Sequence, residues 1–396
     1  MAWNPWRGLG NLPREVWWLA LVTFINRAGM MALPFLVLYL TKHRGYAPTT
    51  AGFALTLYGF SALLSAPFAG RLSDRIGPWR QMELSLLFSG GLLILFPWVR
   101  NLESTLGLIV LWAVVSEAFR PASLAAIVDL VQPEQRKAAY SLNRLAINLG
   151  MSIGPLAGGF ILLVSYPLLF WVDGATSLAA GLFLLSKRHV RAPHTAPAAS
   201  SPLRLQSLRD TRLRYFLLAI VPVVLVFFQH NGTLPLFLVR DLHLPESAYG
   251  MLFTVNTLLI VALEVPLNLA MTHWPHRHAL ALGAFLIAAG FGVTGFAGGF
   301  ASAAAAVAVW TFGEMIFLPG AAAYMAEIAP AAQRGEYMGM YQMTFSLGFT
   351  LSGALGTFIF ERLGAGNLWT IMFLAGSLSA CLLRQIKSQP SRPPHA

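Results

Sequence analysis

The sequence predicts an all-α membrane protein with twelve transmembrane helices arranged in two six-helix halves. Three observations lead to this fold class. Apolar residues form 56% of the 396 residues and charged residues only 11%, with a mean hydropathy of +0.63, which is outside the range of soluble domains. Twelve stretches are long and apolar enough to cross a bilayer. The chain also repeats itself once with an offset of 198 residues, half its length.

The repeat is clearest between residues 117–160 and 314–358. The residues Pro121, Asp129, Arg136, Gly150, Gly158 and Phe160 recur in the same order as Pro319, Glu327, Arg334, Gly348, Gly356 and Phe358. A repeat of this kind in an apolar chain is typical of secondary transporters, whose halves rock about a shared central site. We therefore expect an N-terminal half over residues 1–186, a cytoplasmic linker over 187–212, and a C-terminal half with a short tail over 213–396.

Each span is placed by its length, because about 20 mostly apolar residues are needed to cross the hydrocarbon layer. In the first half the expected spans cover residues 16–41, 48–69, 82–99, 106–129, 138–163 and 168–186. In the second half they cover residues 213–239, 247–271, 279–298, 302–326, 336–360 and 367–385. The first span is too long for the apolar core of a cleaved signal peptide, so we expect it to be retained.

Basic residues orient the spans. The linker is rich in Ala, Pro and Ser and flanked by Arg, so it cannot bury a core. Most of the 27 lysines and arginines fall on the side that holds the linker and both termini, whereas the opposite side holds Lys42, Arg44, Arg100, Arg240 and Arg362. Both termini are therefore expected in the cytoplasm, in a multi-pass protein of the cell (inner or plasma) membrane. The net charge of +11 fits contact with anionic membrane lipids and does not indicate nucleic acid.

A motif between spans two and three indicates the family. Residues 70–80 read Gly-Arg-Leu-Ser-Asp-Arg-Ile-Gly-Pro-Trp-Arg, which predicts a short loop with glycines at both ends. This segment closely resembles the loop signature of the major facilitator superfamily, and resemblance to that superfamily extends over essentially the whole chain. In the family the loop locks the cytoplasmic side closed. The resemblance implies that role for Gly70, Asp74, Arg75, Gly77 and Arg80.

Span five carries a second motif, formed by Gly150, Gly154, Pro155, Gly158 and Gly159. Small residues three or four apart let another helix approach closely, and the proline bends the span. The pattern is similar to an element associated with proton-driven exporters of the superfamily. It therefore implies the drug/proton antiporter branch.

Span one departs from the pattern of that branch. Many such exporters have an acidic residue before the Ala-Leu-Pro of this span, whereas this chain has Arg27. The segment from Asn26 to Leu40 also faintly resembles the first span of proton-coupled peptide transporters. It lacks their paired glutamates, which argues against peptide import.

Ionisable residues inside spans are the candidates for coupling, because each costs a few kcal/mol or more at the bilayer centre. Glu117 and Glu314 lie at nearly equivalent depths in spans four and ten, and Glu264 lies in span eight. A buried carboxylate that gains and loses a proton could couple transport to a proton gradient. The expected charge partners are Arg27, Arg120 and Arg144.

Simpler interpretations of these residues stay open. Glu117 could form a static ion pair with Arg27 or Arg120, and the arginines near span ends could snorkel to water. Asp173, near a helix end, is expected to be a cap or a hydrogen-bonded structural acid.

Span seven places aromatic rings beside hydrogen-bonding side chains at membrane depth, which suits a pocket for an amphipathic organic molecule. His230 could instead simply donate to a helix carbonyl. The expected cavity residues are Phe228, Gln229, His230, Asn231, Asn256, Tyr58, Tyr324, Tyr341 and Gln342.

Other classes of protein find little support. The chain lacks a glycine-rich nucleotide loop ending in Lys-Ser or Lys-Thr, which disfavours a self-powered pump, and no constellation indicates an enzyme or a cofactor. Residues 273–278 occupy the place of the gate motif in the second half but lack its carboxylate. Their histidines are expected to form a solvated turn and not a metal site. The single cysteine, Cys381, excludes an internal disulfide.

These observations predict a monomeric proton-coupled exporter of amphipathic organic compounds. Its expected partners are a small-molecule substrate, protons and membrane lipids. An importer or facilitator of peptides, sugars or other metabolites, or a lipid or lysolipid translocator, is the alternative within the same fold. A non-transporting receptor or scaffold is disfavoured by the matching acids.

Overall fold

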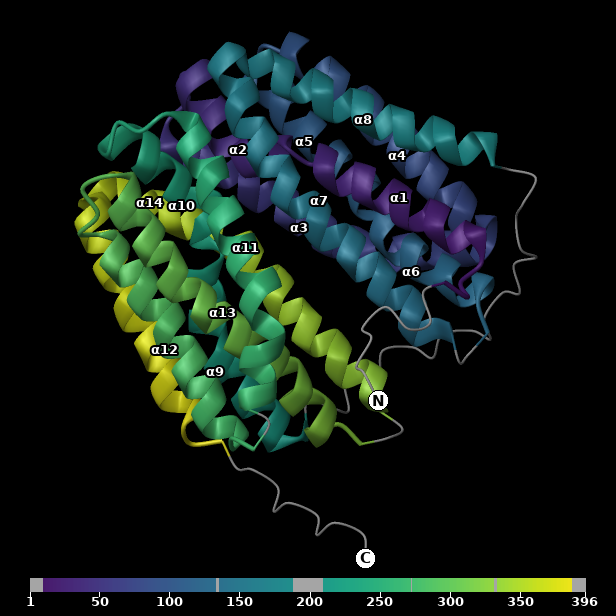
Figure 1. Cartoon of the computed structure of the whole chain (residues 1–396). Helices are drawn as coiled ribbons and strands as arrows, with labels where there is room; N and C mark the ends of the chain where they lie inside the picture. Colours follow the sequence, from purple (N-terminus) through teal and green to yellow (C-terminus); the bar gives the residue numbers. More distant parts are fainter. Residues whose placement is uncertain (1–9, 133–134, 188–208, 272, 331–332, 387–396) are drawn as a thin grey trace, which may run out of the picture. The chain divides into compact units, whose positions relative to one another are not determined.

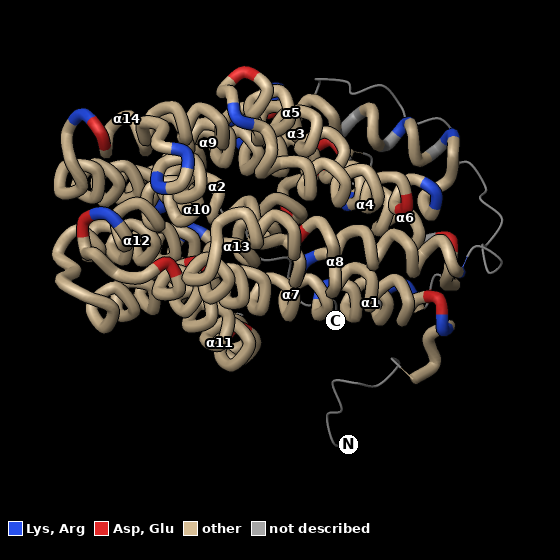
Figure 2. Tube along the Cα trace, turned by 90° about the horizontal axis from the view of Figure 1, so that it is seen from above, with Lys and Arg blue, Asp and Glu red and all other residues tan. Residues whose placement is uncertain are grey.

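The computed structural model describes residues 10–132, 135–187, 209–271, 273–330 and 333–386 (Figure 1). Every regular element within these residues is a helix, and none is a strand. Helices satisfy all their backbone hydrogen bonds internally, which lipid requires. Ten helices in the described part are long and apolar enough to cross a membrane. Figure 2 shows how sparse Lys, Arg, Asp and Glu are along them.

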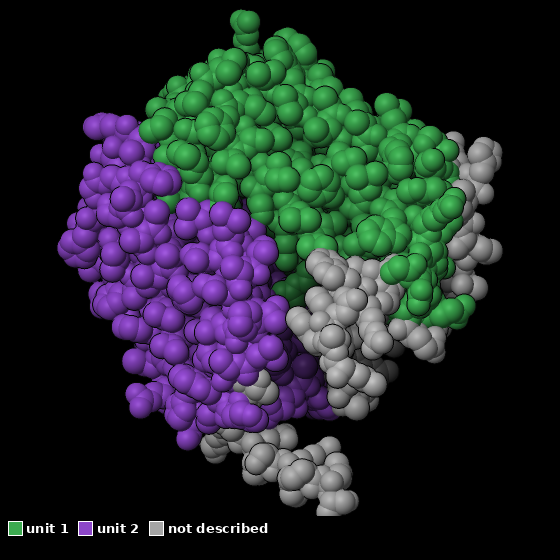
Figure 3. Space-filling model, in the orientation of Figure 1, with its two compact units in different colours: residues 1–200, 245–254 green, residues 201–244, 255–396 purple. Residues whose placement is uncertain are grey.

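The chain divides into two compact units (Figure 3). Unit 1 comprises residues 1–200 and 245–254, and unit 2 comprises residues 201–244 and 255–396. Most of the expected linker, residues 188–208, lies outside the described residues.

Unit 1 holds the helices of the first half and the beginning of α11. Its elements are α1 Arg14–Gly29, α2 Ala32–Leu38, the π-helical turn η1 Tyr39–His43, α3 Pro48–Ile76, α4 Pro78–Leu95, the 3-10 turn η2 Phe96–Trp98, α5 Leu102–Glu117, α6 Phe119–Leu130, α7 Arg136–Val164 and α8 Tyr166–Ser186. Unit 2 holds most of the remainder: α9 Thr211–Phe227, α10 Gln229–Leu236, the π-helical turn η6 Phe237–Asp241, the rest of α11 Glu246–Ala270, α12 His276–Thr294, α13 Phe300–Ile328 and α14 Arg334–Leu383.

Span one, expected as one continuous helix, is interrupted between α1 and α2. The interruption frees backbone N–H groups that an unbroken helix would use. Two of them, on Met31 and Ala32, donate to Oδ2 of Asp173 at 3.0 and 2.9 Å. Asp173 is thus a hydrogen-bonded cap, as expected, and its carboxylate comes from α8, more than 140 residues along the chain.

Spans four and seven are interrupted as well. α5 gives way to α6 at Ala118, and α9 gives way to α10 at Phe228. Met30 and Phe228, which follow the last residues of α1 and α9, are 198 residues apart, and so are the starts of η1 and η6. The repeat therefore preserves helix irregularities as well as side chains, and such breaks in transporters commonly lie near binding sites.

The prediction of a loop over residues 70–80 is wrong for most of its length. α3 continues through Ile76, and only Gly77 separates it from α4, which begins at Pro78. Gly77 has φ +83°, a conformation that favours glycine, and proline suits the first turn of a helix. One residue of this kind is enough to reverse the chain, so no longer loop is needed. The side chain of Asp74 lies outside the described side chains.

The joint expected between spans eleven and twelve is also short. α14 runs over 50 residues but contains one residue with non-helical backbone angles, Gly364, at φ 82° and ψ 166°. The glycine again supplies the positive φ that turns the chain without a loop.

The glycines of span five allow α7 to pack closely on the end of α1. A Cβ atom on Gly150 would lie 2.5 Å from Cβ of Arg27, and one on Gly154 would lie 3.0 Å from the Arg27 carbonyl oxygen. Unit 2 repeats this packing, because Gly348 and Gly356 face Val224 and Gln229 across the α9/α10 interruption. In each unit, glycines therefore bring a long helix onto the broken span.

The first turns of α11 pack within unit 1. Gly250 lies against the carbonyl oxygen of Pro155, and the ring of Tyr249 meets that of Phe35 edge-on with centroids 5.1 Å apart. Glu246 accepts hydrogen bonds from Nζ of Lys42 at 3.0 Å and from the hydroxyl of Tyr166 at 2.7 Å. These last three residues are called the Glu246 clasp below.

Candidate functional site

Unit 1 contains the first candidate acid, Glu117, at the end of α5. The hydroxyl of Tyr58, on α3, donates to Oε1 of Glu117 at 3.3 Å. Tyr58 is buried, and its ring meets that of Trp112 with centroids 5.0 Å apart. Glu117 itself is half-buried. The acid is thus held by a neutral donor on a neighbouring helix.

Unit 2 contains the second candidate acid in the same arrangement. Nδ2 of Asn256, on α11, donates to Oε2 of Glu314, on α13, at 2.8 Å, and to the hydroxyl oxygen of Thr311 at 2.9 Å. Tyr58 and Asn256 are 198 residues apart, and the two acids are 197 apart. Each unit therefore pairs a glutamate with a neutral donor on a neighbouring helix, with the donors at equivalent positions of the repeat and the acids displaced by one residue.

The expected arginine partners do not contact these acids directly. Within the described residues, no Lys or Arg nitrogen lies within 4.0 Å of the carboxylate of Glu117 or Glu314. Nη1 of Arg27 instead donates to the sulfur of Met30 at 3.1 Å. Arg120 and Arg144 are exposed, which fits the snorkelling alternative.

Glu264, the third candidate, lies on α11 and is half-buried. It is near enough to Glu314 for the two carboxylates to interact electrostatically. Its backbone carbonyl accepts a hydrogen bond at 2.8 Å from Asn268, whose amide also donates to the Met315 carbonyl at 3.0 Å.

The polar residues of span seven are engaged inside unit 2. Gln229 is buried, and its amide donates to the carbonyls of Leu225 and Ser352 at 3.2 and 3.3 Å. Nδ1 of His230 donates to the Phe227 carbonyl at 2.6 Å, while Nε2 accepts from Asn231 at 2.8 Å. Both ring nitrogens are thus used by helix neighbours, in agreement with the simpler interpretation of His230.

Two of the remaining cavity candidates, Phe228 and Tyr341, pack on the same ring, that of Phe345, with centroid distances of 6.5 and 4.9 Å. The ring of Phe228 packs on that of Phe349 with centroids 5.3 Å apart. Tyr324 is buried and meets the ring of His276, at the beginning of α12. Tyr341 is buried against Phe345, whereas Gln342 is exposed.

The segment over residues 273–278 is not a solvated turn throughout. α12 begins at His276, and Nε2 of this residue lies 2.9 Å from Oε2 of Glu327, on α13. The carboxylate that the local sequence lacks therefore comes from another helix. Among the described residues, no three or more His, Cys, Asp and Glu side chains are grouped so that they could hold a metal ion.

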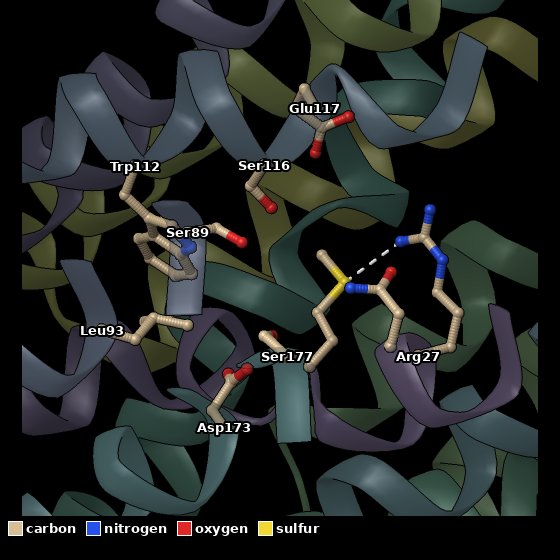
Figure 4. Close-up of a pocket in the computed structure, with 10 residues that line it drawn as sticks. Arg27, Ser89, Leu93, Trp112, Ser116, Glu117, Asp173 and Ser177 are labelled. Atoms are coloured by element: carbon tan, nitrogen blue, oxygen red, sulfur yellow. Dashed lines mark hydrogen bonds between the residues drawn. The ribbon is translucent and has the colours of Figure 1, made fainter. Parts of the chain in front are cut away.

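A small polar pocket lies inside unit 1 between α1, α4, α5 and α8 (Figure 4). Its volume is about 10 Å³, roughly the room for the centre of one water molecule. Its lining residues are Asn26, Arg27, Met30, Ser89, Leu93, Trp112, Ser116, Glu117, Asp173 and Ser177. Figure 4 shows Glu117 and Asp173 entering the pocket from opposite ends.

The pocket is not evident from the sequence. Ser89 and Ser177 look unremarkable within apolar spans, and Glu83, another buried acid on α4, was passed over. One signal was available in the repeat, since positions 89, 173 and 177 are polar whereas the positions 198 residues later are apolar.

These features define a multi-pass helical membrane protein with acids in its spans, the character of a transporter. The model of the Major Facilitator Superfamily matches residues 19–245 and residues 217–395. The chain belongs to this superfamily. Membership implies a transporter of small molecules and not an enzyme.

Relatives of known sequence cover most of the chain. The uncharacterized MFS-type transporter YqjV of Bacillus subtilis is 24% identical over 89% of this chain and 87% of its own. The multidrug resistance protein MdtH of Aeromonas hydrophila is 24% identical over 93% of each chain. A Na(+), Li(+), K(+)/H(+) antiporter of Planococcus maritimus is 23% identical over 82% of this chain and 84% of its own.

Solved structures agree on the fold. The nucleoside transporter NupG superposes with a TM-score of 0.78 at 13% identity, covering 94% of this chain and 98% of its own. A POT family transporter in complex with 5-aminolevulinic acid superposes with a TM-score of 0.77 at 14% identity, covering 93% and 95%. At these identities the likeness concerns the fold alone.

Proposed function

We propose that this transporter is a proton-coupled exporter of amphipathic organic compounds that works by alternating access. The observation that carries the proposal is the repeated donor–acid pair, Tyr58 with Glu117 and Asn256 with Glu314. An acid held by a neutral donor can persist with or without its proton. An acid locked in a buried ion pair would leave a bare cation whenever it was protonated.

The glycine pattern of span five and the name of the relative MdtH support efflux of drug-like compounds. One second candidate is exchange of alkali cations for protons. It is supported by the name of the Planococcus maritimus relative and by the approach of Glu264 to Glu314, two carboxylates that could bind a cation together. Peptide import is disfavoured, since span one lacks the paired glutamates.

The proposal includes a topology of twelve spans with both termini in the cytoplasm of a cell membrane. The twelve spans are the ten apolar helices, with α14 counted as two spans divided at Gly364, and in addition α3, which has 29 residues. The halves are residues 1–186 and 213–396, connected by the linker 187–212. The transporter is proposed to act as a monomer surrounded by lipid, with Asp74 and its neighbours as the cytoplasmic gate.

The proposal is tested with purified protein in liposomes under an imposed pH gradient. The panel contains lipophilic cations, Na⁺ and K⁺, peptides, sugars and lysolipids. Accumulation of lipophilic cations against their gradient, abolished by a protonophore, is the expected result. Uptake confined to Na⁺ and K⁺ would support the second candidate, and gradient-independent movement of sugars or peptides would refute the proposal.

Variants then identify the coupling acid. Glu314→Gln or Glu117→Gln should abolish uphill transport while downhill exchange persists, because an amide mimics the protonated acid but releases no proton. Glu103→Gln, an exposed acid on the same helix as Glu117, is the matched control and should behave as the parent. Uphill transport with the parental pH dependence in both variants would remove the two acids from the mechanism.

A static role for Glu117 has a different signature. If Glu117 mainly neutralises Arg27, Glu117→Gln should lower thermal stability, and adding Arg27→Gln should restore it. Measured unfolding temperatures of the two single variants and the double variant distinguish the roles.

A further inference from the structure

We propose that Asp173 is a proton-binding site that controls the interruption between α1 and α2. Its carboxylate is buried, with 3% of the residue exposed, and Asp173 lines the polar pocket of unit 1. Oδ2 accepts the N–H groups of Met31 and Ala32 at 3.0 and 2.9 Å. Among the described residues no other side chain accepts from these two amides, although the Met31 N–H also approaches the Gly29 carbonyl at 2.6 Å, so Asp173 is the side-chain cap of α2.

The second oxygen, Oδ1, is available to a proton. No described protein group donates to it, and Asp173 lines the polar pocket of Figure 4 together with Ser89 and Ser177. The pocket has room for roughly one water, which two hydroxyls and a carboxylate could hold. Such a water can deliver a proton to Oδ1: an O–H bond of a hydronium breaks, an O–H bond to Oδ1 forms, and the carboxylate becomes a neutral acid.

The repeat shows that the fold does not require this pocket. The same interruption occurs in unit 2 at Phe228, 198 residues after Met30. There the positions equivalent to Asn26, Arg27, Ser89, Asp173 and Ser177 are Val224, Leu225, Ile287, Ile371 and Ala375. The interruption of unit 2 is therefore built without a carboxylate at the position of Asp173, where Ile371 stands, and uses polar side chains of span seven itself. The polar groups of unit 1 add a chemical property that the architecture alone does not need.

Protonation would loosen the interruption. Hydrogen bonds from N–H groups to a charged oxygen are about twice as strong as those to a neutral one. A neutral Asp173 would therefore hold Met31 and Ala32 less firmly. The end of α1 is also packed closely by α8, where Gly29 meets Thr176, and by α7, where Gly154 meets the Arg27 carbonyl. A change in the charge of Asp173 would consequently alter the contacts that α7 and α8 make with span one.

Few charged groups can compete with Asp173 for a proton. From α1, Arg27 lines the same pocket, and from α5, Glu117 does. The pocket residues of α4 are neutral, and α7 faces the interruption with glycines. At the start of α8, Tyr39 meets Phe170, and His43 stacks on Tyr166, whose own hydroxyl donates to Glu246.

The inference deepens the proposed proton coupling, on which its role in transport rests, but binding of a proton can be measured without transport. The first experiment is a pH-induced infrared difference spectrum of the full-length protein in lipid nanodiscs. The parent should show the C=O band of a carboxylic acid as the pH is lowered. Asp173→Asn should lose one component of it, whereas Glu117→Gln should lose a different one. A spectrum of Asp173→Asn that superimposes on the parent would overturn the inference.

The second readout is hydrogen exchange of Met31 and Ala32, expressed as protection relative to the unstructured rate. Protection should fall roughly three- to tenfold as the acid is protonated. In Asp173→Asn it should be constant with pH, because the amide still accepts but does not titrate. Ser186→Ala, an exposed serine at the other end of α8 and outside the pocket, is the matched control and should keep the pH dependence. A parental pH dependence in Asp173→Asn would show that Asp173 only caps the helix.

If Asp173→Asn fails to fold, the test uses Asp173→Glu, which keeps a titrating carboxyl group on a side chain that is one methylene longer. Its infrared band or the midpoint of its titration should differ from the parent, and identity in both would overturn the inference. Failure of uphill transport in liposomes with the Asp173 band intact would count against the proposed function and leave this site standing.

Discussion

In the Glu246 clasp, the stabilisation from the Lys42 ion pair can be compared with that from the Tyr166 hydrogen bond. Glu246 accepts from Lys42 at 3.0 Å and from Tyr166 at 2.7 Å, and its own side chain is only 14% exposed. The Lys42 side chain is 48% exposed, so the ion pair should contribute no more than about 1 kcal/mol. A hydroxyl bonded to a charged carboxylate contributes about 1.5–3 kcal/mol. The tyrosine bond, and not the ion pair, should dominate.

These magnitudes predict an order among three variants. Glu246→Gln keeps the size of the side chain but loses its charge, which should cost about 1–2 kcal/mol, or roughly tenfold in the opening equilibrium of residues 246–254. Tyr166→Phe should approach the same effect. Lys42→Gln should change opening less than about fivefold, and high salt should remove its effect because exposed pairs are screened.

Hydrogen exchange of residues 246–254 in nanodiscs measures this opening directly. Exchange in residues 10–30 serves as the internal reference, since the clasp does not touch them. An effect of Lys42→Gln equal to or larger than that of Tyr166→Phe would refute the ranking. Unchanged exchange in Glu246→Gln would show that the apolar contacts of Tyr249 and Gly250 hold this segment without the clasp.

Two further predictions concern the sequence motifs. Asp74→Asn should shift the resting population toward the inward-facing state if Asp74 helps to lock the cytoplasmic side, and an unchanged distribution in distance measurements between spin labels would contradict that role. Gly154→Leu should lower transport while the protein still inserts, since overpacking costs about 1–3 kcal/mol where a Cβ would already lie 3.0 Å from the Arg27 carbonyl. Gly91→Leu is the matched control, because a Cβ on Gly91 meets nothing within 4 Å, and equal activity of the two leucine variants would show that Gly154 is merely tolerated.

Local composition determined much of this protein. Helical spans follow from runs of apolar residues, because lipid leaves the backbone no other partner than itself. The family followed from short motifs, and Glu117 and Glu314 stood out because charged residues are rare at membrane depth. These properties depend on residues close together in the chain, so they can be read without knowing the fold.

Local sequence could not predict which side chains contact one another. The donors to the two acids, Tyr58 and Asn256, lie on other helices, some 58 to 59 residues away from the acids they contact. Arg27, the natural partner by charge, is directed to Met30 instead. Which side chains meet depends on helix rotation and crossing, and these are set by packing over the whole unit.

The interruption of span one shows most clearly what the sequence determines and what tertiary structure decides. Residues 16–41 are apolar enough for one continuous helix, although Pro34 denies the Met30 carbonyl its helical donor and so favours a break at this point. The break exists where Gly154 admits α7 from one side and Asp173 receives two freed N–H groups from the other. A helix interruption in a membrane is stable only when such distant partners replace its lost hydrogen bonds, and that compensation is decided by tertiary structure.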